Sequence, residues 1–157
     1  MNIDIIAVGK IKEKFLRDAI EEYSKRLSAF VKLTITEIPD EKIPDNASAK
    51  VMEKIKESEG RQILSKLRPG AVVAMCIEGS QYSSEDIAHY LNTTANTNSR
   101  ITFIIGGSLG LYDEVKKAAS TKMSFGKITL PHQLMRVVLL EQIYRGYKII
   151  NNQSYHK

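Results

Sequence analysis

Short apolar runs alternate with longer amphipathic stretches along most of the chain, and this alternation restricts the possible fold more than any other feature. The apolar runs have the length of strands and occupy residues 3–8, 33–38, 71–77 and 100–105. Helical spacing of apolar residues is found at 13–30, at 51–67 and from Ser83 onwards. The connections are too long for hairpins. The sequence therefore predicts one α/β domain over residues 1–157, with a mostly parallel sheet and helices on both faces.

The last third of the chain adds three further elements. Residues 113–120 have the pattern of a short helix and 127–130 that of a fifth strand, and Pro131 begins a helix that continues to about Ile150. This last helix carries apolar side chains on nearly every side. A domain of 157 residues has little room to bury such a helix completely, so we expect a homodimer.

Cysteine content and the apolar pattern indicate where the protein resides. Cys76 is the only cysteine, which excludes a disulfide within the monomer and is typical of a reducing compartment. It lies in the apolar run 72–77, so we expect a buried strand residue rather than a catalytic thiol. Asp4 stands where a signal peptide would be basic, and no apolar run reaches membrane-spanning length. These features predict a soluble, cytoplasmic protein without membrane contact.

Charge and histidine spacing narrow the possible partners. The chain has 23 Lys and Arg residues against 18 Asp and Glu, and the net charge of +5 favours a polyanion as partner. His89, His132 and His156 are far apart, with no Cys or Glu beside them at ligand spacing. We therefore expect no metal site.

A glycine-rich turn, Gly106 to Gly110, directly follows a predicted buried strand. Ligands of α/β proteins bind beyond the carboxyl ends of strands, and glycines allow the backbone to approach them closely, although a tight turn without a ligand would have the same pattern. The turn also spells Gly-x-Ser-x-Gly, the nucleophile motif of serine hydrolases, with Asp113 and His132 following in that order. Asp113 comes too soon after Ser108 for an easy triad, so a hydrolase remains the weaker alternative.

Two features near the C-terminus could contact a ligand or RNA. Arg136 lies among Leu140, Ile143 and Tyr147 on the last helix, where its charge requires a carboxylate, a phosphate or a ligand, unless the side chain extends to solvent. Elsewhere on this helix, Glu141 and Arg145 have the spacing of an ion pair. The tail 155–157, Tyr-His-Lys, combines an aromatic ring with cations, as RNA-contacting segments do.

Taken together, these segments resemble one family over essentially the whole chain, the bacterial ribosomal RNA large-subunit pseudouridine N3-methyltransferases. These are minimal, single-domain members of the SPOUT superfamily. The resemblance rests on five motifs in order: Ile6-Ala7-Val8-Gly9-Lys10, Glu37-Ile38-Pro39, Ile105-Gly106-Gly107-Ser108-x-Gly110, Leu130-Pro131-His132-Gln133-x-Met135-Arg136-Val137-Val138-Leu139-x-Glu141-Gln142-x-Tyr144-Arg145, and Tyr155-His156-Lys157. The fourth and fifth motifs are the most specific.

The resemblance implies a fold and an activity. Members have an α/β domain with a C-terminal trefoil knot, form homodimers and bind S-adenosylmethionine in the knot. They methylate N3 of a pseudouridine in large-subunit (23S) rRNA, within the assembled ribosome. By position, the cofactor site would comprise Met75, Gly106, Phe125, Gly126, Lys127, Ile128, Thr129 and Leu130. The residues expected to face the RNA are His132, Arg136, Tyr155 and His156, with the tail completing the site of the partner subunit.

Several positions depart from the family pattern. Met75 and Cys76 stand where Leu is expected, Leu109 stands where a polar residue is common, and Ser154 stands where Pro is frequent. For the reaction, we expect Arg136 to stabilise the negative charge that develops on the pseudouridine ring and His156 to accept the proton of N3. Two alternatives stay open at this stage, namely a serine hydrolase that uses Ser108 and a ribosome-binding module without catalytic activity.

Overall fold

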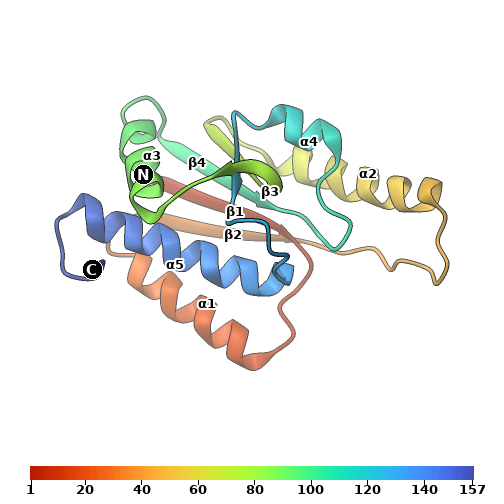
Figure 1. Ribbon diagram of the computed structural model, residues 1–157, viewed down its shortest axis with the longest axis horizontal. Coiled ribbons are helices and arrows are strands. Elements are labelled where there is room, and N and C mark those ends of the chain that lie inside the picture. Colours follow the sequence, from red (N-terminus) through yellow and green to blue (C-terminus); the bar gives the residue numbers. More distant parts are fainter.

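A five-stranded parallel sheet forms the centre of the protein, which a computed structural model describes over residues 1–157 (Figure 1). The strands lie in the order β2-β1-β4-β3-β5, and every neighbouring pair is parallel. The predicted α/β class and the parallel sheet are therefore confirmed. The strands are β1 (Asn2–Val8), β2 (Lys32–Ile38), β3 (Ala71–Gln81), β4 (Arg100–Ile105) and β5 (Thr121–Ser124).

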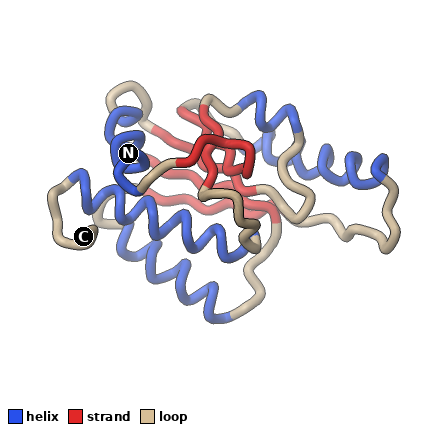
Figure 2. The backbone as a smooth tube through the Cα atoms, viewed as in Figure 1, coloured by secondary structure: helices blue, strands red, loops and turns tan.

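Five helices cover the two faces of the sheet (Figure 2). One face packs against α1 (Lys14–Leu27), α3 (Ser84–Ala95) and α5 (His132–Ile150), and the other against α2 (Ala49–Lys66) and α4 (Asp113–Ala118). The connections through α1 and α3 lead toward the β2 side of the sheet and cross the first face. The connections through α2 and α4 lead toward the β5 side and cross the second face. All four crossovers therefore have the same hand, as parallel connections nearly always do.

Alternation along each strand divides the core into two halves. In β1, Ile3, Ile5 and Ala7 belong to the cluster beneath α1, α3 and α5, whereas Ile6 and Val8 belong to the cluster beneath α2 and α4. Both clusters are almost fully buried. This explains why the strand sequences read as continuous apolar runs, since a side chain on either face meets a helix.

The fifth strand was predicted in the wrong place. Residues 127–130 form a loop, and the strand is Thr121–Ser124, which pairs with β3 at the edge of the sheet. Only Met123 of this strand belongs to the hydrophobic core, so a strand of four residues has almost no apolar pattern. The apolar Ile128 that suggested a strand is 70% exposed instead.

Other local expectations can be compared directly with the structure. Ser48 and Ser83 are helix N-caps, and Ser83 forms a capping box with Asp86, so α3 begins where helical spacing begins in the sequence. Cys76 lies in β3 as expected, but it is half-buried rather than buried.

No helix is both long and apolar enough to cross a membrane. Strand order does not define how the chain is threaded, so the trefoil knot stays a prediction.

The first test concerns the capping box of α3. The Ser83 side chain accepts a hydrogen bond from the Asp86 N–H at 3.0 Å, and the Asp86 carboxylate accepts one from the Ser83 N–H at 2.9 Å. We expect Ser83→Ala to lower the free energy of unfolding by about 1 kcal/mol, because one N–H of the first turn loses its acceptor. Ser99→Ala, at an exposed side chain without a hydrogen bond, should change it by less than about 0.5 kcal/mol in the same urea titration. Equal losses would contradict the assignment.

Candidate functional site

A tight glycine turn follows the carboxyl end of β4. The Gly110 N–H donates to the Gly107 carbonyl at 3.0 Å, and Gly110 has a positive φ of 80°. A methyl group on Gly106 would lie 2.9 Å from the backbone carbonyl carbon of Gly110, so no larger residue fits there without a shift of the backbone. The turn is thus narrow because glycine occupies the positions where the backbone folds back on itself.

A cavity of about 190 Å³ opens beside this turn. Its walls come from the carboxyl end of β3, from the glycine turn, from α4 and from the beginning of α5. Most lining side chains are apolar or belong to glycine, and the polar exceptions are Glu78, Lys116 and His132. The lining residues are Met75, Cys76, Ile77, Glu78, Gly106, Gly107, Gly110, Leu111, Lys116, Leu130, His132 and Met135.

A second, smaller hollow adjoins the first and is lined by part of the 125–130 loop. It shares Met75, Cys76, Ile77 and Met135 with the first cavity and adds Met123, Ser124, Phe125, Gly126 and Ile128. The Ser124 hydroxyl fixes this loop, because it donates to the Gly126 carbonyl at 3.0 Å and accepts from the Gly126 N–H at 3.1 Å. The glycine turn and the loop thus meet around the end of β3.

The residues expected to bind a cofactor are therefore grouped, with two exceptions. The side chains or backbone of Met75, Gly106, Phe125, Gly126, Ile128 and Leu130 line the two cavities. Lys127 and Thr129 are exposed and line neither of them. The assignment of these residues to a cofactor stays a prediction.

An ion pair at the first cavity was not anticipated from the sequence. Lys116 of α4 pairs with Glu78 of β3, and their hydrogen bond raises the pKa of the lysine and lowers that of the glutamate. The two residues are far apart in the chain and belong to no recognisable motif, so only the fold brings them together. Burial raises the pKa of the nearby Cys76 thiol, which keeps it protonated and unreactive.

Arg136 lies near the beginning of α5 and points into the protein. It is only 2% exposed; one terminal nitrogen donates to Glu37 Oε2 at 2.8 Å and the other to the Gly9 carbonyl at 2.9 Å. The same Glu37 oxygen accepts from the Ile11 N–H at 3.2 Å. The sequence left a carboxylate, a phosphate or a ligand as possible partners of Arg136. In the structure the partner is the Glu37 carboxylate. A contact with RNA would require this pair to open.

His132, one turn before Arg136, is half-buried and lines the first cavity. A methyl group on Gly9 would lie 3.3 Å from His132 Nε2, so the imidazole sits directly against the loop that follows β1. The beginning of α5 is therefore bound to the ends of β1 and β2 at the same edge of the sheet as the glycine turn.

The C-terminal tail folds back onto its own subunit. The Tyr155 hydroxyl donates to Glu141 at 3.0 Å, its ring meets Tyr144 edge to face, and Arg145 lies over the ring. Burial and the Glu141 carboxylate raise the pKa of Tyr155 to about 12.

His156 completes this arrangement. Its Nε2 lies 2.7 Å from Glu85 of α3, and its Nδ1 lies 3.3 Å from Arg145, which forms the predicted pair with Glu141 at 2.6 Å. The tail follows the end of α5, whereas His132 lies at its beginning (Figure 1). Within one subunit, Tyr155 and His156 are therefore not grouped with His132 and Arg136.

The serine hydrolase alternative lacks its essential contact. A catalytic serine requires a hydrogen-bonded base, which in turn is oriented by a third group. No hydrogen bond joins Ser108, Asp113 and His132. Nor does any group of three or more His, Cys, Asp or Glu side chains have a geometry that could hold a metal ion.

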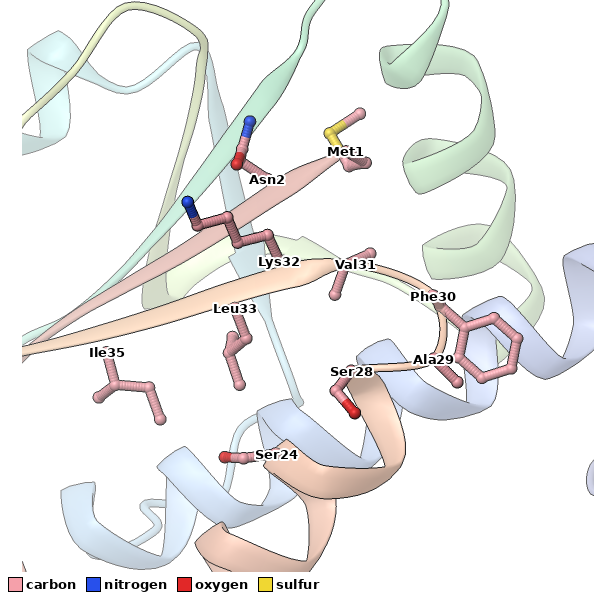
Figure 3. A pocket seen from close by; sticks show the side chains of 10 residues that line it. All are labelled: Met1, Asn2, Ser24, Ser28, Ala29, Phe30, Val31, Lys32, Leu33 and Ile35. Atoms are coloured by element: carbon pink, nitrogen blue, oxygen red, sulfur yellow. The ribbon is translucent and has the colours of Figure 1, made fainter.

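The largest hollow, of about 860 Å³, lies elsewhere (Figure 3). It lies beside the beginnings of β1 and β2 and the end of α1, and contains none of the predicted site residues. Ligands of parallel α/β sheets bind at the carboxyl ends of the strands, which form the opposite edge. We therefore place the candidate site at the glycine turn.

Comparisons with known proteins identify the family of this chain. The sequence model of the family described as "Predicted SPOUT methyltransferase" matches residues 1–156. The chain is 55% identical to ribosomal RNA large subunit methyltransferase H 1 of Clostridium perfringens (strain SM101 / Type A) and 57% identical to ribosomal RNA large subunit methyltransferase H of Clostridium beijerinckii. Each alignment covers 100% of both chains.

A solved structure adds evidence on the fold alone. The chain superposes on a probable methylase family protein from Haemophilus influenzae Rd KW20 with a TM-score of 0.54 and 10% sequence identity. The superposition covers 99% of this chain and 70% of that one.

The second test concerns the anion that neutralises Arg136. We expect Glu37→Gln to lower the free energy of unfolding by roughly 2–3 kcal/mol, because the guanidinium stays buried without a counter-charge. The loss should be smaller than for a fully buried pair, since the Glu37 side chain is 40% exposed. Glu57→Gln is the matched control, because it removes an exposed pair with Arg61 and should cost less than about 1 kcal/mol. Denaturant unfolding that gives equal losses would show that Glu37 does not support Arg136.

Proposed function

Because this chain belongs to the SPOUT methyltransferase family, we propose that it transfers a methyl group from S-adenosylmethionine to large-subunit ribosomal RNA. The proposed acceptor is N3 of a pseudouridine in the assembled ribosome, as the sequence resemblance implies. The observation that carries the proposal is that the glycine turn and the 125–130 loop line adjoining cavities at the carboxyl end of β3. Relatives named as rRNA large subunit methyltransferases support the choice of substrate.

The residues around these cavities suit such a cofactor. Met75, Ile77, Leu130 and Met135 offer apolar surface for an adenine ring. Backbone N–H and C=O groups in 125–130 lie outside helices and strands, so many of them are free to bind the polar edges of the cofactor. The two cavities share a wall, which suits a ligand that bends from one into the other.

The chain must supply alignment and proton transfer. The bound cofactor carries a methyl group on a positively charged sulfur, which makes that carbon electrophilic. The cofactor would supply this methyl carbon to N3 of the substrate, so the protein has to hold the nitrogen in line with the carbon–sulfur bond. N3 also loses its proton, which a basic side chain has to accept.

We assign these tasks to residues near the start of α5 and in the tail. His132 lines the cavity and would contact the substrate. Arg136 would stabilise the negative charge that develops on the ring, and for this its pair with Glu37 has to open or be shared. His156 would accept the proton. Because the tail folds away from His132 within one subunit, this role requires the tail of a second copy.

Exposed apolar side chains support the proposed homodimer. Ile77 is 55% exposed, Ile128 70% and Leu134 39%, and the first two line the cavities. Leu134 lies in the first turn of α5, next to Met135 of the same cavity wall. An apolar surface of this kind around a cavity is suited to a second subunit, which would also close the site to water.

The third test is calorimetric titration with S-adenosylmethionine. We expect the wild-type chain to bind it, and Gly106→Ala to bind at least about tenfold more weakly, because the new methyl group displaces the turn that lines the cavity. Ser108→Ala, in the same turn but at an exposed side chain, is the control and should bind like the wild type. Absence of binding by the wild type would favour the ribosome-binding module, and loss of an esterase activity in Ser108→Ala would favour the hydrolase.

The fourth test asks whether two copies build one site. Arg136→Ala and His156→Ala should each slow single-turnover methylation by roughly 10²-fold or more at saturating cofactor. If the tail completes the partner's site, mixing the two inactive variants should restore activity, because some mixed dimers contain one site with both residues. Wild-type rates in both single variants would remove the assignments, and mixtures that stay inactive would place both residues in one subunit's site.

A further inference from the structure

The segment from Lys10 to Arg17 carries an exposed aromatic ring between cations. Phe15 is 70% exposed, although it lies in the first turn of α1, whose other side is buried through Leu16. Lys10, Lys12 and Arg17 are exposed as well. We call residues 10–17 the Phe15 segment. A ring this exposed contributes little to folding and is accessible to a partner from outside.

The charges of the Phe15 segment are only partly neutralised. Lys14 pairs with Asp18 at 2.6 Å, and Arg17 donates to the carbonyls of Ile11 and Lys12, which fixes the loop. Lys10 and Lys12 have no carboxylate partner, and Glu13 is the only acid between them and Phe15. Two cations therefore remain available beside the ring.

Hydrogen bonds attach this segment to the candidate site. Gln133 Nε2 donates to the Lys10 carbonyl at 3.2 Å, and Arg136 donates to the carbonyl of the preceding Gly9 at 2.9 Å. In Figure 1 the start of α1 lies at the same end of the molecule as the start of α5. A macromolecule whose reacting base lies at His132 would therefore extend over this segment.

We propose that the Phe15 segment is a docking surface for ribosomal RNA, on which a base stacks against Phe15 while Lys10 and Lys12 contact phosphates. This rests on the proposed function, since it concerns the same substrate beyond the reacting nucleotide. Aromatic rings bordered by cations bind unpaired bases in this way. A protein partner fits less well, because lysine is depleted at protein interfaces and the apolar surface suited to a second copy lies around Ile77, Ile128 and Leu134.

Phe15→Ala is the first variant for the test, and Phe15→Trp restores a stacking surface. Ribosomes from cells that lack the gene for this chain serve as substrate, with labelled S-adenosylmethionine. We expect Phe15→Ala to raise the ribosome concentration at half-maximal rate by about tenfold, as the loss of one stacked base would. Phe15→Trp should stay near the wild type. Val51→Ala, at an exposed apolar residue of α2, is the control and should have no effect.

A second pair of variants tests the cations. Lys10→Ala combined with Lys12→Ala should weaken ribosome binding and reduce the slope of log affinity against log salt by roughly 1–2, about one for each lost phosphate contact. Lys50→Ala combined with Lys54→Ala removes two exposed lysines of α2 and should leave the slope unchanged.

The outcomes separate this inference from the proposed function. The maximal rate and the affinity for S-adenosylmethionine should be unchanged in all of these variants. A Phe15→Ala protein with wild-type half-saturation, in the presence of an active wild type, overturns the docking surface and leaves the methyltransferase intact. So does a Phe15→Ala protein that sediments as a smaller species, since Phe15 would then contact a second copy. A wild type that transfers no methyl group to ribosomes overturns both proposals.

Discussion

Parallel pairing of β4 with both β1 and β3 is the constraint on which the arrangement depends. All strands run the same way, so their carboxyl ends meet at one edge of the sheet. The loop after β1, the end of β2, the extension of β3 and the glycine turn after β4 converge there. Helix α5 begins at this edge and returns across the sheet against α1 and α3, which brings His132 and Arg136 to the same place. A small domain thereby gathers a site from segments spread over most of its length.

Much of this fold could be predicted because most elements carry their own signal. The apolar run of β4 was predicted at the correct residues, and β1, β2 and the beginning of α3 were found within one residue. β5 was misplaced because Met123 alone contributes to the core, whereas Ile128 is apolar but exposed. A short strand at a sheet edge is determined by its pairing with β3, and a local pattern does not contain that information.

The site divides in the same way. The glycine turn and the buried charge of Arg136 could be recognised from sequence. Clustered glycines directly after a strand and a cation among apolar helix residues are both unusual, so each requires an explanation. The partner of Arg136 could not be named, because Glu37 lies near the other end of the chain and reaches it only through the sheet. The same holds for Glu78 and Lys116 at the cavity. The tail was expected to lie near RNA, but its contacts with Glu85, Glu141 and Tyr144 depend on how α3 and α5 pack.

The strand order also has a consequence for biosynthesis. β4 lies between β1 and β3, yet it is the fourth strand to be translated. Until it leaves the ribosomal exit tunnel, β1 is hydrogen-bonded on one side only and β3 has no neighbour at all. A nascent chain of this protein therefore exposes one open edge on β1 and both edges of β3 during elongation, the kind of surface that recruits chaperones or other unfinished chains. Insertion of β4 joins β1 and β3 in a single step, and β5 then covers the remaining edge of β3, so the sheet is assembled late.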